Sequence, residues 1–107
     1  MTTTDTTYLE APEGKISGSP LRGQHALVTG ATRGIGAAIA ETLGRLGADL
    51  TLIGRDRDSL DERAGEIAGA SSIKVHVETA DVSDPDAVGA AFTVAVAANG
   101  PISILVN

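Results

Sequence analysis

The fold of this chain is decided by residues 29–36, TGATRGIG, which place three glycines in the pattern G-x-x-x-G-x-G. The short apolar run HALVT (25–29) leads into them, and residues 34–46 continue with apolar side chains at helical spacing. A glycine-rich turn between a buried strand and a helix favours anion binding, because the helix N-terminus offers free N–H groups and a positive dipole end. The stretch therefore predicts a phosphate site.

Each glycine of this turn has a distinct expected role. Gly30 permits the tight turn off the strand, Gly34 lets a pyrophosphate approach the backbone, and Gly36 lets the helix pack close to the sheet. A P-loop is excluded, because no Gly-Lys-Ser/Thr follows the turn.

The remainder of the chain alternates between strand and helix patterns. Strands are predicted at residues 25–29, 49–53, 73–78 and 102–106, and helices at 34–46, 57–68 and from residue 83 to about 99. Strands separated by helices predict an α/β fold with a doubly wound parallel sheet, in the strand order 3-2-1-4. Strict alternation in IKVHVE (73–78) places the third strand at an edge of the sheet.

Local signals predict the helix faces and helix starts. The apolar face of the first helix is expected to hold Ile35, Ile39, Leu43 and Leu46. The second should bury Leu60, Ala64, Ile67 and Ala68, and the third Val88, Ala91, Phe92, Ala95 and Val96. Asp56 is expected to cap the second helix, and a capping box from Ser83 to Asp86, with Pro85 in the first turn, to open the third.

Composition and charge exclude several classes of function. The net charge of −6 argues against a nucleic-acid groove or a polybasic membrane patch. The chain has no cysteine and no apolar stretch long enough to span a bilayer, which predicts a protein of the cytoplasm. Residues 1–20 are expected to form a flexible tail, residues 21–107 the folded part, and no metal site is expected.

Three motifs resemble those of the short-chain dehydrogenases/reductases. That family carries T-G-x-x-x-G-I-G, an Asp-Val pair after the third strand and N-N-A-G after the fourth; here residues 29–36, Asp81-Val82 and the terminal Asn107 stand in these places. The resemblance covers about residues 21–107 and implies the N-terminal half of a Rossmann domain. It also implies an oxidoreductase that interconverts a carbonyl and an alcohol by hydride transfer, with a small-molecule substrate and a homo-oligomeric assembly.

The predicted cofactor site rests on the residues of the glycine turn and the second strand, and on the family resemblance. Its expected members are Gly30, Thr32, Arg33, Gly34, Ile35, Gly36, Arg55, Asp81, Val82 and Asn107. By resemblance, Asp81 accepts from the adenine amino group, the Val82 N–H donates to the adenine ring, and Asn107 ties the fourth strand to the cofactor ribose and the neighbouring strand.

The choice of nucleotide depends on charge at the end of the second strand. A carboxylate there would bind the ribose 2′-hydroxyl of NAD, but Gly54 occupies the position and Arg55 follows it. Arg33 in the turn adds a second guanidinium, so the 2′-phosphate of NADP is favoured. Asp56 leaves an alternative open, either as a helix cap or as a carboxylate that selects NAD one residue late.

No catalytic residue can be named in these 107 residues. The family uses a Tyr-x-x-x-Lys pair and a Ser, but the only tyrosine is Tyr8, and position 12 is a proline. His25 and His76 are expected to be strand residues without a chemical role. Two interpretations stay open: a partial NADP-dependent oxidoreductase whose catalytic half lies elsewhere, or a non-catalytic nucleotide-binding or interaction module.

Overall fold

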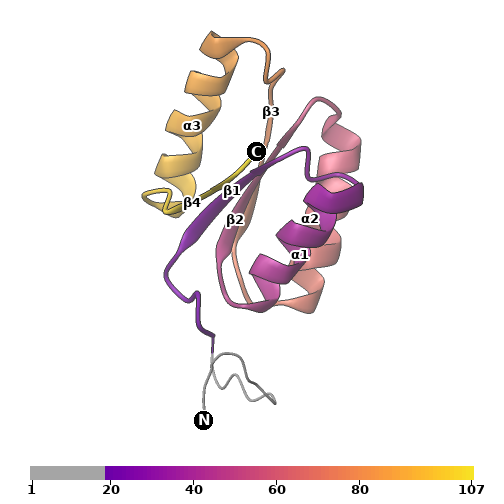
Figure 1. Ribbon diagram of the computed structural model, residues 1–107, viewed down its shortest axis with the longest axis vertical. Coiled ribbons are helices and arrows are strands. Elements are labelled where there is room, and N and C mark those ends of the chain that lie inside the picture. Colours follow the sequence, from indigo (N-terminus) through magenta and orange to yellow (C-terminus); the bar gives the residue numbers. More distant parts are fainter. Residues whose placement is uncertain (1–18) are drawn as a thin grey trace.

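Four parallel strands form one sheet in the order β3-β2-β1-β4, which confirms the predicted strand order (Figure 1). The computed structural model describes residues 19–107, so most of the tail expected over residues 1–20 lies outside the described residues. The strands are β1 (His25–Thr29), β2 (Asp49–Gly54), β3 (Val75–Thr79) and β4 (Ile104–Val106). β3 begins at Val75 rather than at residue 73, and it lies at an edge as the alternating pattern predicted.

Helices cover both faces of this sheet. Helices α1 (Gly34–Arg45) and α2 (Arg57–Ala70) lie on one face, and α3 (Pro85–Asn99) lies on the other (Figure 1). Neighbouring residues of β1 therefore serve two cores, because successive strand side chains point to opposite faces. Ala26 and Val28 pack in the core beneath α1 and α2, whereas Leu27 packs with α3.

Small residues let α1 lie close to the sheet, and this overturns part of its predicted apolar face. Ile35 is 80% exposed, while the buried residues of α1 are Ala37, Ala40 and Gly44. A Cβ at Gly44 would lie 3.0 Å from the side chains of Ile67 and Ile73, so a larger residue there would require these side chains to shift. Two further residues expected in helix faces, Ala68 and Val96, are exposed.

Aspartates cap the other two helices. The Asp56 carboxylate accepts from the Asp58 N–H and caps α2, as predicted. At α3 the predicted capping box is wrong, because Asp84 is the N-cap and accepts from the N–H groups of Asp86 and Ala87. Pro85 follows in the first turn, where its missing N–H costs nothing.

His25 is a buried member of β1 with both ring nitrogens engaged. Nδ1 lies 2.8 Å from the Gly100 carbonyl oxygen, and Nε2 lies 2.8 Å from the Thr51 hydroxyl. These bonds join the start of β1 to β2 and to the loop after α3. His25 thus has a structural role at the end of the sheet opposite the glycine turn.

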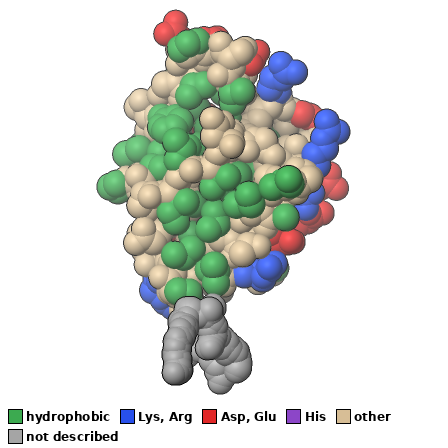
Figure 2. Space-filling view, viewed as in Figure 1, with side chains coloured by type: hydrophobic (Ala, Val, Ile, Leu, Met, Phe, Trp, Pro, Cys, Tyr) green, Lys and Arg blue, Asp and Glu red, His purple; other side chains and the backbone are tan. Residues whose placement is uncertain are grey.

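On the face of the molecule that Figure 2 shows, apolar and charged side chains gather over different halves. In Figure 2, hydrophobic side chains gather over the half that α3 and β4 occupy, and charged side chains lie mostly over the half of α1 and α2. Val94, Val96 and Leu105 are exposed members of the apolar half. None of the helices within residues 19–107 combines the length and the apolar character needed to cross a membrane.

Candidate functional site

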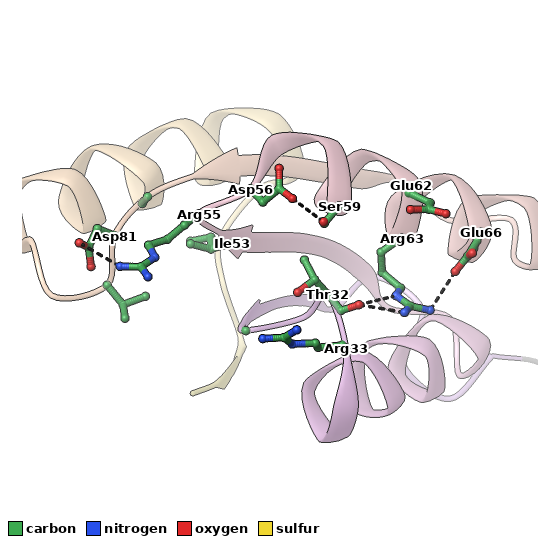
Figure 3. Close-up of a pocket in the computed structure, with 14 residues that line it drawn as sticks. Thr32, Arg33, Ile53, Arg55, Asp56, Ser59, Glu62, Arg63, Glu66 and Asp81 are labelled. Carbon is green, nitrogen blue, oxygen red and sulfur yellow. Dashed lines mark hydrogen bonds and ion pairs between the residues drawn. The ribbon is translucent and has the colours of Figure 1, made fainter.

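A pocket of about 560 Å³ lies where β1, β2 and β3 end, as shown in Figure 3. In open α/β sheets this carboxyl edge is where ligands bind, in the crevice that the strand-to-helix loops leave. The pocket is lined by Gly30, Thr32, Arg33, Ile53, Gly54, Arg55, Asp56, Ser59, Glu62, Arg63, Glu66, Ala80, Asp81 and Val82. Six of the ten predicted site residues are among them.

The turn between β1 and α1 requires glycine for two reasons, a positive φ at two positions and a lack of space for a Cβ at a third. Gly30 and Gly34 have φ values of +63° and +65°, which side chains rarely adopt. At Gly36 the limit is space, because an added Cβ would lie 2.1 Å from the Gly30 carbonyl oxygen. The predicted role of Gly36 needs a correction: the backbone that it must clear is that of Gly30 in the turn itself, not the sheet.

The N-terminus of α1 is left without a side-chain cap. Its N-cap residue, Arg33, makes no capping hydrogen bond, and the first turn of the helix holds no acidic residue. By contrast, α2 and α3 are capped by Asp56 and Asp84 and carry an acidic residue in the first turn. An uncapped helix start beside a pocket offers N–H groups and a positive dipole end to an anion.

Arg55 and Asp81, which follow the ends of β2 and β3, form an ion pair at one side of the pocket (Figure 3). The Arg55 Nη1 and Asp81 Oδ2 atoms are 3.6 Å apart, and the Arg55 side chain is 77% exposed (Figure 3). The other Asp81 oxygen, Oδ1, accepts from the Ser83 hydroxyl at 2.7 Å and from the Ser83 N–H at 2.9 Å. These bonds from Ser83, and secondarily the Arg55 charge, hold the pKa of Asp81 below its ordinary value.

Arg33 lines the same pocket from the glycine turn. Its backbone is extended, with φ −158° and ψ 171°, and its side chain is exposed. Arg33 and Arg55 thus border one cavity from two neighbouring turns, as the sequence predicted (Figure 3). Whether they hold a phosphate stays a prediction.

Asp56 caps α2, which confirms one of its two predicted roles. Its role in selecting NAD stays a prediction. Oδ1 accepts from the Asp58 N–H at 3.2 Å, and Oδ2 accepts from the Ser59 hydroxyl at 2.6 Å. Each carboxylate oxygen of Asp56 therefore accepts one hydrogen bond from α2, and Gly54, two residues earlier, has no side chain.

Four predicted site residues do not line the pocket. Gly34, Ile35 and Gly36 lie in the turn and first helical turn beside it, and Ile35 is 80% exposed. Asn107 follows β4, and its Oδ1 accepts from the Thr29 hydroxyl at 3.0 Å. That bond links the end of β4 to the neighbouring β1, immediately before the glycine turn.

Arg63 is a pocket residue that the sequence did not reveal. It comes from the second turn of α2, and its Nε and Nη2 atoms donate to the Thr32 carbonyl oxygen at 3.3 and 2.9 Å. In the sequence, Arg63 is one of several charged residues along the polar face of this helix between Asp56 and Glu66. A pattern cannot tell which member of such a face reaches a turn 31 residues earlier.

Comparisons with known proteins identify one family. The sequence profile described as short chain dehydrogenase matches residues 24–107. Gluconate 5-dehydrogenase from Gluconobacter oxydans is 42% identical over 87 residues, which are 81% of this chain and 34% of that protein.

Solved structures of the same kind superpose on the chain. L-sorbose reductase from Gluconobacter frateurii, complexed with NADPH and L-sorbose, aligns with a TM-score of 0.79 at 34% identity, over 83% of this chain and 34% of that one. A metagenomic short-chain oxidoreductase in complex with NADP aligns with a TM-score of 0.76 at 45% identity, over 81% and 39%. The chain therefore spans about a third of the length of the relatives that it matches.

Proposed function

The chain belongs to the short-chain dehydrogenase family, and from that premise we propose that the full-length protein is an NADP(H)-dependent oxidoreductase, in which these residues bind the cofactor. When bound, the nicotinamide supplies the hydride donor or acceptor that interconverts a carbonyl and an alcohol. The 107 residues contain no Tyr-x-x-x-Lys pair, so the proposal gives this part of the protein cofactor binding alone. A small carbonyl or alcohol substrate, a homo-oligomer and a cytoplasmic location stay predictions.

One observation supports cofactor binding above the others: the uncapped start of α1 opens beside a pocket at the carboxyl edge of the sheet. The pyrophosphate would meet the N-terminal N–H groups of this helix, which no side chain of the turn occupies. Gly34 has no Cβ in the way of the approaching pyrophosphate. The space that a Cβ would take there is open, with no atom within 4 Å.

The charges of the pocket support NADP over NAD. Arg33 and Arg55 border the space, Gly54 offers no carboxylate, and the oxygens of Asp56 serve α2. The 2′-phosphate would draw Arg55 away from Asp81. An exposed ion pair contributes about 0–1 kcal/mol, whereas a charge-assisted hydrogen bond to a phosphate contributes roughly 1.5–3 kcal/mol. The exchange of partners therefore favours the phosphate.

Asp81, Val82 and Asn107 complete the proposed site. Asp81 is held in place by Ser83, so its carboxylate is pre-positioned for the adenine amino group. Val82 is 58% exposed beside it, where its N–H would donate to the adenine ring. Asn107, tied to Thr29, would contribute to the ribose end of the site.

Calorimetric titration of NADPH and NADH into the full-length protein tests the proposal. We expect wild type to bind NADPH more tightly, and Arg55→Ala to weaken NADPH by about ten- to a hundredfold while NADH barely changes. Gly54→Asp should weaken NADPH binding, by repelling the 2′-phosphate, and strengthen NADH binding, by accepting from the 2′-hydroxyl. Its Cβ would lie 3.3 Å from the buried Leu60 side chain, which must shift by a few tenths of an ångström, so the melting temperature of this variant is measured beside its affinities.

Arg45→Ala is the matched control for the loss of one positive charge. Arg45 lies in the last turn of α1 and pairs with Glu41 at 3.7 Å, outside the pocket. Equal wild-type affinities for both nucleotides would contradict the NADP proposal, as would a parallel loss of both in Arg55→Ala. NADPH oxidation with a panel of carbonyl compounds then tests turnover, and its failure with every compound would favour a non-catalytic module.

A further inference from the structure

Arg63 fastens α2 to the glycine turn. Two of its nitrogens donate to the Thr32 carbonyl oxygen, and its third, Nη1, lies 2.8 Å from Glu66 Oε1 (Figure 3). The Arg63 side chain is 27% exposed, well below the 77% of Arg55. A half-buried, charge-assisted contact of this kind is less screened by solvent than a surface ion pair.

The bonded carbonyl belongs to the peptide that leads into Arg33. Because a trans peptide is planar, fixing the Thr32 oxygen also fixes the direction of the Arg33 N–H and the position of its Cα. The glycines on either side, Gly30 and Gly34, give this short segment wide conformational freedom. An external contact is therefore needed to select one orientation of the peptide.

Resting on the proposed function, we propose that Arg63 is a positioning residue for recognition of the 2′-phosphate: it holds the Thr32–Arg33 peptide so that the Arg33 side chain faces the pocket. Arg63 is assigned to the turn rather than to the ligand, because three of its five N–H groups, at least one on each nitrogen, already donate to Thr32 or Glu66. Arg63 thus joins the proposed site as a residue that does not contact the cofactor but on which recognition of the cofactor depends.

The test compares Arg63→Met with Arg57→Met in the full-length protein. Arg57 is a matched control, because it lies on the same helix and donates to a backbone carbonyl, that of Val77, but does not line the pocket. Affinities for NADPH and NADH are measured by calorimetry. Amide resonances of Arg33 and Gly34 in the ligand-free protein are measured by ¹⁵N–¹H TROSY spectra.

We expect Arg63→Met to weaken NADPH binding by about tenfold and NADH binding by less than about threefold. The reason is that Arg33 would lose its position toward the 2′-phosphate, which only NADPH carries. The Arg33 and Gly34 resonances should shift in the ligand-free variant and stay in place in Arg57→Met. Arg63→Lys keeps the charge but cannot donate from two fixed nitrogens, so it should lie between wild type and Arg63→Met. It also keeps the test open should Arg63→Met fail to fold.

Several outcomes would overturn the inference. An unchanged NADPH affinity in Arg63→Met would do so, as would an equal loss in Arg57→Met. Weaker NADPH binding with unshifted ligand-free resonances would mean that Arg63 touches the ligand directly. If wild type shows no preference for NADPH, the proposed function fails, whereas the resonance shifts still report separately whether Arg63 holds the turn.

Discussion

Replacing Gly36 by alanine is the sharpest available test of the site geometry. Alanine is a better helix former than glycine by about 1 kcal/mol, so a helical Gly→Ala change stabilises wherever space allows. At Gly36 the added Cβ would lie 2.1 Å from the Gly30 carbonyl oxygen and 2.9 Å from its carbon. Both atoms are backbone, so no side chain can turn aside to relieve the contact.

The magnitude follows from a comparison with Gly89, in the second turn of α3. A Cβ at Gly89 would meet nothing within 4 Å, so Gly89→Ala gains the helix propensity without a clash. Gly36→Ala gains the same propensity but must move α1 away from the turn by about 1 Å, and overpacking of this kind costs about 1–3 kcal/mol. The difference in stability between the two variants should therefore be about 1–3 kcal/mol.

Thermal unfolding of the two full-length variants measures this difference. We expect Gly89→Ala to melt above wild type and Gly36→Ala to melt several degrees below Gly89→Ala. We also expect NADPH affinity to fall in Gly36→Ala alone, because the displaced helix start no longer faces the pocket. If Gly36→Ala melts as high as Gly89→Ala, the close approach of α1 to the Gly30 carbonyl is refuted.

Three further changes probe the network around the site. Thr51→Val should lower the free energy of unfolding by about 1–3 kcal/mol, because it leaves the buried His25 Nε2 without its 2.8 Å partner; a urea titration without loss would contradict this. Asp56→Ala should cost about 1 kcal/mol by removing the cap of α2. NADH affinity should stay unchanged in that variant, and a marked loss in calorimetry would restore Asp56 as a ligand. Since the pKa of Asp81 is lowered in the fold, the stability lost in Asp81→Asn should be constant between about pH 5 and 8. It should shrink only as the pH falls below the ordinary value of 3.8 toward the lower folded pKa. Thermal melts of wild type and Asp81→Asn across this pH range measure the stability difference. A difference that appears only above about pH 6 would contradict a lowered pKa of Asp81.

Much of the fold could be predicted because each element carries its own local signal. The run at 25–29, the glycines after it and the cap at Asp56 each specify an element without reference to distant residues. The strand order then follows from the handedness of the crossovers. The buried face of α1 could not be read in this way, because spacing alone does not show how near a helix lies to its sheet. In the structure Ala37 and Ala40 are buried, whereas Ile35, in the first turn of α1, is exposed to solvent.

The candidate site, like the fold, has features that the sequence predicts and features that it does not. Arg33 and Arg55 could be assigned to one place, because parallel strands bring their carboxyl ends to one edge of the sheet. The contact of Arg63 with Thr32 and the pairing of Arg55 with Asp81 depend on the reach of long side chains across the pocket. Ser83 was likewise expected to cap a helix, whereas it binds Asp81, because the next residue takes the capping position.

The central place of β1 in the sheet has a consequence for biosynthesis. β1 leaves the ribosome before the other three strands of this sheet, yet it lies between β2 and β4, and its pairing with β4 joins Ala26 to Ile104, 78 residues later. At about 5–20 residues per second, that interval lasts roughly 4–16 s. During this time we expect β1 and β2 to pair first, while the other edge of β1 stays open. The nascent chain thus exposes one unpaired edge of an apolar strand for seconds, which is the period when a chaperone would protect it most.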